Sequence, residues 1–99
     1  MWILRSSGPS GGELTFRLRP GGIKTVGRAP RADFIVDVAL VSRLHCRLEA
    51  GDNNLDVIDL SSTNGTYVNG KRVKRARLTS GDRLRVGRVE PTVRRKGSA

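Results

Sequence analysis

Apolar residues recur at every second position along much of this chain. Residues 14–18 read Leu-Thr-Phe-Arg-Leu and residues 44–48 read Leu-His-Cys-Arg-Leu, so apolar and polar side chains alternate. A period of two is typical of β-strands that bury one face. No segment carries the apolar stripe of an amphipathic helix. The pattern therefore predicts an all-β protein.

Turn-forming residues divide the rest of the chain into further short segments. Strands are expected at residues 23–26, 55–60 and 84–86, where glycine, asparagine or aspartate nearby in the sequence marks the turns. Residues 34–36 are continuously apolar, which fits a strand buried on both faces or one with a bulge. Val89 and Val93 flank Pro91, which favours an edge strand because proline has no N–H to donate.

The dipeptide Asn69-Gly70 predicts a β-hairpin between residues 67–68 and 71–73. Both residues tolerate the positive φ angles of a type I′ turn, whose twist matches that of the strands. About ten short strands at this spacing are typical of an antiparallel β-sandwich. Because 99 residues suit one domain, we expect a single domain over residues 1–96 and a frayed end at residues 97–99.

Composition limits the core and the cellular setting. Only 36% of the residues are hydrophobic and 4% aromatic, so the core must be small and mostly aliphatic. No apolar run is long enough to span a membrane, and the chain does not begin like a signal peptide. We therefore expect a soluble intracellular protein. Cys46 is the only cysteine, which excludes an internal disulfide. Its place in an alternating strand favours a buried thiol over a reactive one.

Three short polar segments carry the chemistry that suggests a function. The guanidinium of Arg28 can grip two phosphate oxygens in a fixed fork. Ser42 and Arg43 place a hydroxyl beside a second cation, and Thr63 and Asn64 display a hydroxyl and a carboxamide in a polar turn. These donors predict a shallow cleft that reads phosphorylated protein. Solvated arginines and ordinary turn residues are the alternative interpretation of the same segments.

Four motifs in the correct order identify the chain as similar to the forkhead-associated (FHA) domain family. They are Gly27-Arg28, Ser42-Arg43-Leu44-His45, the run from Ser62 to Gly70, and the run from Leu78 to Gly87, which looks like the closing hairpin of that family. The resemblance covers nearly the whole chain. It implies an eleven-stranded β-sandwich that binds phosphothreonine peptides through loops at one end. A narrower resemblance is to nibrin-like DNA-damage-response proteins, which implies a nuclear location. It is carried by Met1-Trp2, Gly8-Pro9 and Gly11-Gly12-Glu13, and by the placement of Arg28, Ser42, Arg43 and His45 so near the start of the chain.

The resemblance also implies a role for each motif residue. Phosphopeptide binding is expected for Arg28, Ser42, Arg43, Thr63 and Asn64, and structural support of the site for Gly27, His45 and Gly65. His45 is the only histidine, and no set of metal-binding residues accompanies it. We therefore expect His45 to brace the loops, and we expect neither a metal nor another cofactor.

The charge is unevenly placed. The formal net charge is +10. Residues 1–70 hold 8 Lys/Arg and 7 Asp/Glu, whereas residues 71–99 hold 11 Lys/Arg and 2 Asp/Glu. The basic residues of 71–88 would share one exposed face if they alternated along neighbouring strands. Such a face is either an ordinary solvated surface or a patch that attracts acidic residues or nucleic acid.

Two classes of function follow from the sequence. The first is a phosphothreonine-dependent protein-interaction module whose partner carries acidic residues around the phosphothreonine. The alternative is binding of nucleic acid or an acidic partner through the basic segment 71–96, although base-stacking aromatics are missing there. An enzyme is not expected, because the chain offers no paired acid and base, no Ser-His-acid set and no metal cluster.

Overall fold

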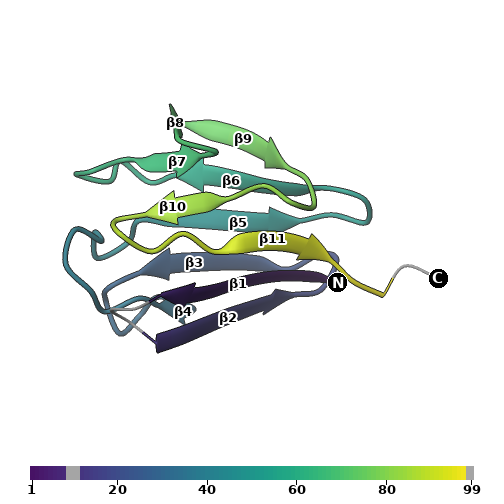
Figure 1. Ribbon diagram of the computed structural model, residues 1–99, viewed down its shortest axis with the longest axis horizontal. Coiled ribbons are helices and arrows are strands. Elements are labelled where there is room, and N and C mark those ends of the chain that lie inside the picture. Colours follow the sequence, from purple (N-terminus) through teal and green to yellow (C-terminus); the bar gives the residue numbers. More distant parts are fainter. Residues whose placement is uncertain (9–11, 98–99) are drawn as a thin grey trace.

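A computed structural model describes residues 1–8 and 12–97 and contains eleven strands (Figure 1). The strands are β1 (Trp2–Gly8), β2 (Gly12–Leu18), β3 (Ile23–Gly27), β4 (Phe34–Ile35), β5 (Cys46–Ala50), β6 (Leu55–Asp59), β7 (Thr66–Val68), β8 (Lys71–Val73), β9 (Arg75–Leu78), β10 (Leu84–Val86) and β11 (Thr92–Arg95). The described residues form no helix, so the prediction of an all-β fold is confirmed. The described residues therefore contain no helix that is long and apolar enough to cross a membrane.

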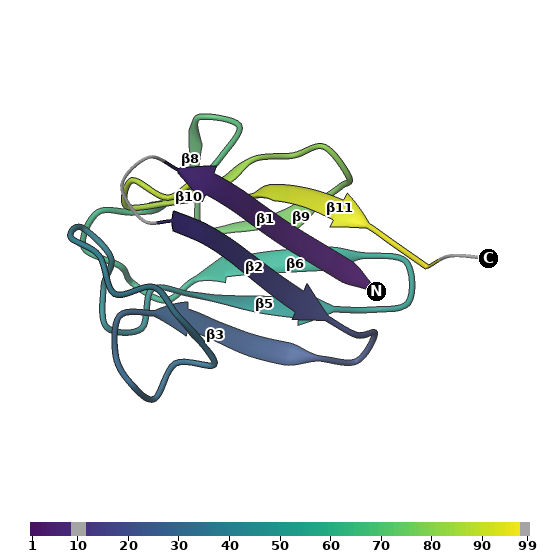
Figure 2. The ribbon, with the colours of Figure 1, turned by 60° about the horizontal axis from the view of Figure 1, so that its bottom comes forward.

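The strands form two layers. One layer is the five-stranded sheet β4-β3-β5-β6-β9. The other combines β11-β1-β2 with β10-β7-β8, which meet where Leu84 N–H donates to the Pro91 carbonyl at 3.0 Å. Figure 2 shows β1 and β2 lying in front of the five-stranded sheet. The core between the layers is mostly aliphatic, with Leu4 and Leu18 from one layer and Leu48 from the other almost completely buried.

The predicted hairpin and the predicted buried thiol are both confirmed. Strands β7 and β8 pair across Asn69-Gly70, whose φ angles of 51° and 83° suit a type I′ turn. The Cys46 side chain is completely buried, and burial raises the pKa of its thiol to about 12. A thiol with this pKa is almost entirely protonated at neutral pH and is a poor nucleophile.

The run 34–36 is not a strand buried on both faces. Strand β4 pairs only with β3, so it lies at the edge of its sheet, and half of the Ile35 side chain is exposed. The β3–β4 pair is also parallel, in contrast to the antiparallel pairing expected throughout. Its parallel direction arises because the chain loops back between Gly27 and Phe34 before it pairs.

The run from Leu78 to Gly87 does not form a hairpin. Strand β9 pairs with β6, whereas β10 pairs with β7, so the connection between them crosses from one layer to the other. Strand β1 was missed by the sequence analysis, although it pairs with both β2 and β11 and contributes the buried Trp2 and Leu4. β11 directly follows Pro91 and is the last strand of its three-stranded sheet, as expected, although its outer side also bonds to residues 81–84, where Val93 N–H donates to the Asp82 carbonyl at 2.8 Å. Of the end predicted to be frayed, residues 98–99 lie outside the described part of the chain.

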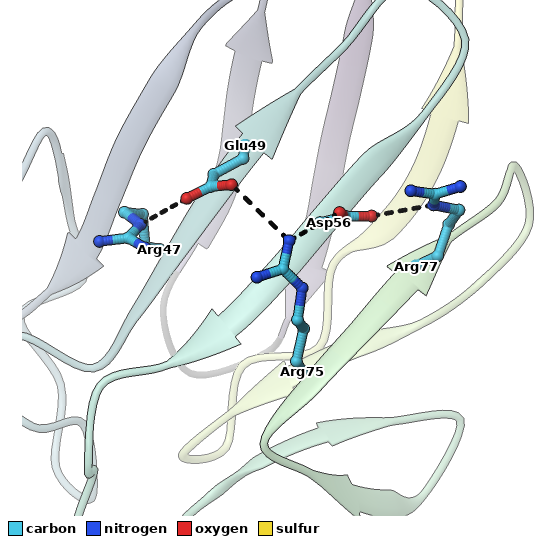
Figure 3. A network of polar contacts seen from close by, with 5 residues as sticks. All are labelled: Arg47, Glu49, Asp56, Arg75 and Arg77. Carbon is cyan, nitrogen blue, oxygen red and sulfur yellow. Dashed lines mark hydrogen bonds and ion pairs between the residues drawn. The ribbon is translucent and has the colours of Figure 1, made fainter.

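The chain changes layer between β8 and β9 and again between β9 and β10, so the basic residues of 71–88 do not share one face. Arg75 and Arg77 lie on β9, on the outer side of the five-stranded sheet. Both donate to Asp56 on β6, at 3.2 and 3.1 Å (Figure 3). In the same network Glu49 accepts from Arg47 at 2.8 Å. The basic residues of β8 and β10 belong to the other layer.

Candidate functional site

The loops that follow β3, β4 and β6 gather at the end of the sandwich opposite the chain termini (Figure 1). They enclose an open hollow of about 650 Å³ that contains every residue predicted to contact a phosphopeptide: Arg28, Ser42, Arg43, Thr63 and Asn64. Ser61 and several apolar residues, among them Leu40 and Val41, complete the lining, which contains no acidic residue. The hollow therefore combines two arginines and several hydrogen-bonding side chains in one electropositive place.

Close backbone contact between β3 and residues 42–43 positions the two arginines. Arg28 N–H donates to the Ser42 carbonyl, and Ala29 N–H donates to the Arg43 carbonyl, each at 3.0 Å. A Cβ atom at Gly27 would lie 2.1 Å from the Arg43 carbonyl oxygen, so only glycine fits there. Gly27 thus allows the approach that brings Arg28 and Arg43 together. Both also line a neighbouring hollow that includes Asp37.

His45 connects two of the loops from beneath the site. Its ring is completely buried. Ser42 N–H donates to Nδ1 at 3.0 Å. Because Nδ1 is therefore an acceptor, Nε2 carries the proton of the neutral ring and donates to the Gly65 carbonyl at 2.8 Å. These two bonds fix the backbone of Ser42 relative to that of Gly65. His45 therefore lies where a residue that braces the loops would have to lie.

Ser42 and Asn64 already make bonds within the protein. The Ser42 hydroxyl accepts from Thr63 N–H at 3.0 Å, so its own proton remains able to donate to a ligand. The Asn64 amide donates to the Leu40 carbonyl at 3.2 Å. Leu40 has a φ of 72°, a left-handed conformation that costs a non-glycine residue about 1–3 kcal/mol. Asn64 therefore stabilises a strained loop, in addition to displaying its remaining amide groups.

A second layer of polar residues supports the turn that carries Thr63 and Asn64. Asp59 accepts hydrogen bonds from the Ser62 and Thr66 hydroxyls, the latter at 2.8 Å. The Ser62 hydroxyl in turn accepts from Gly65 N–H at 3.0 Å. The sequence analysis missed the roles of Asp59, Ser62 and Thr66. The signal was present in Asp59 and Ser62, because an aspartate three residues before a serine can bond its backbone N–H.

The pKa of Asp59 predicts how this support responds to acid. Burial alone would raise the pKa of Asp59, but hydrogen bonds from Ser62 and Thr66 outweigh it and hold the pKa below its ordinary value. A carboxylate with a lowered folded-state pKa contributes stability that is complete above its unfolded pKa, about 3.9. That contribution is lost as the pH falls through the folded pKa.

We therefore expect Asp59→Asn to lower the free energy of unfolding at pH 7 by about 1–3 kcal/mol, because bonds to a charged acceptor are lost. The difference from the wild type should shrink as the pH approaches 3. Urea unfolding at pH 7, 5 and 3.5 measures both values. A difference that stays constant over this range would show that the Asp59 charge does not support the turn.

Comparisons with known proteins find similar sequences in bacteria. The chain is 37% identical to an oxoglutarate dehydrogenase inhibitor of Corynebacterium diphtheriae, over 82% of the chain and 55% of that protein. It is 39% identical to the glycogen accumulation regulator GarA of Mycobacterium tuberculosis, over 67% of the chain and 41% of that protein. The chain therefore spans about half the length of these curated relatives. One of these proteins is named as an inhibitor of oxoglutarate dehydrogenase and the other as a regulator of glycogen accumulation.

These relatives correct the narrower part of the sequence analysis. They are bacterial proteins, and the resemblance to nibrin-like DNA-damage-response proteins is not supported. A nuclear location, which rested on that resemblance, is not supported either, because bacteria have no nucleus. Of the residues cited for it, Trp2 and Gly8 belong to β1 and Gly12 and Glu13 to β2, whereas Pro9 and Gly11 lie outside the described residues.

One solved structure resembles this chain in both fold and sequence. It belongs to a structural and functional analysis of phosphothreonine-dependent FHA domain interactions, and it matches with a TM-score of 0.87 and 34% identity over 98% of each chain. The FHA domain family matches residues 24–87, which include every residue of the hollow. With the sandwich, the site loops and the relatives in agreement, the chain belongs to the FHA domain family.

Proposed function

We propose that this FHA domain binds a phosphothreonine in an extended segment of a partner protein, at the hollow between its loops. The observation that carries the proposal is the lining of that hollow. It combines Arg28 and Arg43 with hydroxyl and amide side chains, and it includes no carboxylate. A phosphothreonine carries about −1.5 to −2 charges at neutral pH, which two guanidinium groups balance.

Each side chain has a distinct part in this proposal. Arg28 grips two phosphate oxygens with its planar fork. The Ser42 hydroxyl, which already accepts from Thr63 N–H, donates to the phosphate. Arg43 and the Thr63 hydroxyl add a second charge and another donor. The amide groups of Asn64 that remain after its bond to Leu40 pair with the peptide backbone and hold it extended.

The apolar part of the hollow supports phosphothreonine over phosphoserine. Leu40, Val41 and Leu44 line the hollow together with the polar donors. They offer a surface on which the threonine methyl group can be removed from water, which is worth about 0.8 kcal/mol for one such group. The solved FHA structure described above, which concerns phosphothreonine-dependent interactions, points in the same direction.

We further propose that the chain acts as an intracellular regulatory module in a bacterium. The relatives are named as an oxoglutarate dehydrogenase inhibitor and a glycogen accumulation regulator, so a phosphorylated protein linked to metabolism is the partner class that fits. Metal and cofactor are not part of this mechanism. Binding of nucleic acid through residues 71–96 is less well supported, since Arg75 and Arg77 are engaged by Asp56.

Calorimetric titration with three peptides of one sequence tests the proposal. The peptides carry threonine, phosphothreonine or phosphoserine at the central position and neutral residues around it. We expect binding only with the phosphorylated peptides, and about three- to fourfold tighter binding with phosphothreonine, the equivalent of one buried methyl group. Equal affinity for the unphosphorylated peptide would exclude phosphate recognition, and equal affinity for the two phosphopeptides would exclude a role for the methyl group.

A further inference from the structure

The outer face of the layer that contains β1 is rich in arginine. Strand register places the outward-pointing residues in rows, such as Arg94–Ile3–Arg17 across β11, β1 and β2 and Arg85–Tyr67–Arg72 across β10, β7 and β8. The two halves meet where Arg83 pairs with Thr92, which in turn lies beside Arg5. We call the set Arg5, Arg17, Arg72, Arg83, Arg85 and Arg94 the arginine face.

The arginine face differs from the outer face of the five-stranded sheet in its ion pairs. There, Asp56 and Glu49 form ion pairs with Arg47, Arg75 and Arg77 (Figure 3). Within the described residues, by contrast, no arginine of the arginine face makes a salt bridge. Glu13 is the one acidic residue on β1, β2 and β11, and it pairs with Ser7 near the hairpin turn. In the other half of the layer, Asp82 accepts from Asn69 and Thr79 and not from an arginine of the face. No ion pair within the described residues therefore neutralises the arginine face.

A hollow lies within this face, away from the phosphopeptide loops. It has a volume of about 470 Å³ and is lined by Ile3, Arg5, Thr92, Arg94, Arg95 and Lys96. Ile3 is nearly buried among these cations and supplies an apolar floor. Four cations around an apolar floor suit carboxylate side chains, whose methylene groups can rest on the isoleucine.

The arginine face is also continuous with the proposed phosphopeptide site. A Cβ atom at Gly65, in the turn that follows Asn64, would lie 2.6 Å from Nε of Arg72, so Arg72 packs against that turn. Arg85 lies over the Tyr67 ring, 4.0 Å from its centroid, on the next strand pair. A partner bound at the loops can therefore extend along the face without leaving the surface of the sandwich.

We propose that the arginine face is a second docking surface, which binds an acidic stretch of the same partner that presents the phosphothreonine. The inference rests on the proposed function, and it adds a second contact outside the phosphothreonine segment. Unpaired arginines, with a planar fork that matches carboxylates, supply the attraction. The surface increases affinity and selects partners by charge, while the loops recognise the phosphate.

An acidic protein segment fits this face better than nucleic acid does. Sequence-tolerant binding of single strands relies on aromatic side chains that stack on bases. The only aromatic residue on the outward rows is Tyr67, and Arg85 covers one side of its ring. Trp2 points into the core and is almost completely buried. The face thus offers charge without a stacking surface.

Arg5→Glu/Arg94→Glu tests the proposal, because both residues are exposed and line the hollow. The control is Lys71→Glu/Lys74→Glu, which makes the same change in charge at exposed positions that do not line that hollow. The longest dimension of the molecule is 38 Å, so a linker of at least about twelve residues can span from the loops to the hollow. The probes are the neutral phosphopeptide, the same peptide carrying a hexaglutamate block through such a linker at either end, and the block with its linker alone.

At low ionic strength we expect one of the two block positions to tighten binding of the phosphopeptide roughly tenfold, since several exposed ion pairs of modest strength act together. Arg5→Glu/Arg94→Glu should lose this gain and keep its affinity for the neutral phosphopeptide. The control should keep most of the gain. An equal loss in both variants would reduce the effect to net charge, and no gain with either block position would overturn the proposal.

Two further measurements separate this proposal from others. If the neutral phosphopeptide fails to bind, the proposed function is wrong, whereas the hexaglutamate block alone still tests the face. Weak binding of that block, lost in Arg5→Glu/Arg94→Glu and kept in the control, supports the face by itself. Binding of a short DNA duplex that shows the same pattern, without any binding of the acidic block, would assign the face to nucleic acid and overturn the proposal.

Discussion

Replacing Arg28 with alanine is expected to weaken phosphopeptide binding by about a hundredfold or more, while the domain stays folded. A hydrogen bond to a charged group is worth about 1.5–3 kcal/mol, and the fork of Arg28 offers two such bonds to the phosphate. The side chain is exposed, and it is the Arg28 backbone that bonds to Ser42, so the fold does not depend on the guanidinium. Calorimetry with the phosphothreonine peptide and a thermal melt measure the two effects.

Two further variants sharpen this prediction. Arg28→Lys should also lose most of the affinity, because a point charge cannot replace a planar fork. Arg31→Ala is the matched control, since Arg31 is an exposed arginine three residues along the same loop and lines neither hollow at this end. If the folded Arg28→Ala protein retained the wild-type affinity, Arg28 would not belong to the site.

His45→Ala is expected to lower stability and phosphopeptide affinity together. The variant leaves Ser42 N–H and the Gly65 carbonyl without their buried partner, and each loss costs about 1–3 kcal/mol. A domain of this size has a total stability of about 5–15 kcal/mol, so the melting temperature should fall clearly. Affinity should fall as well, because the two loops that hold Ser42 and Asn64 are no longer fixed to each other.

Leu55→Ala separates these two effects. Leu55 is completely buried at the start of β6, the end of that strand away from the site loops. Its truncation should cost about 2–5 kcal/mol of stability. At a temperature where the variant remains folded, its affinity for the phosphopeptide should equal that of the wild type. If His45→Ala kept its stability but lost binding, His45 would contact the ligand directly and the bracing role would be wrong.

Local sequence signals predicted the strands and turns well where the deciding interactions are local. The positive φ angles of Asn69-Gly70 depend only on the two residues concerned, so the hairpin was predictable. Alternation in residues 44–48 correctly assigned Cys46 and Leu48 to the core. The same reasoning failed for residues 78–87, because a turn motif between two strands does not tell whether the strands pair with each other.

The site was predictable as a set of motifs and not as a geometry. Short motifs indicate the chemistry of the five candidate binding residues, and these residues line one hollow. They are Arg28, Ser42, Arg43, Thr63 and Asn64. The supporting contacts were not predictable, since they join residues far apart in the chain. The bond from His45 to Gly65 spans 20 residues, and that from Asn64 to Leu40 spans 24. Nothing in a single leucine indicates the left-handed conformation of Leu40.

The sequence by itself determined that this protein is all-β, that its thiol is buried and that its polar motifs match a phosphate group. These properties follow from the period of apolar residues and from the chemistry of individual side chains. Only the tertiary structure decided how the arginines are used. The pairing of β9 with β6 places Arg75 and Arg77 against Asp56, and within the described residues Arg5 and Arg94 form no ion pair. The physical reason is that the energy of a charge depends on its neighbours in space, and pairing of distant strands chooses those neighbours.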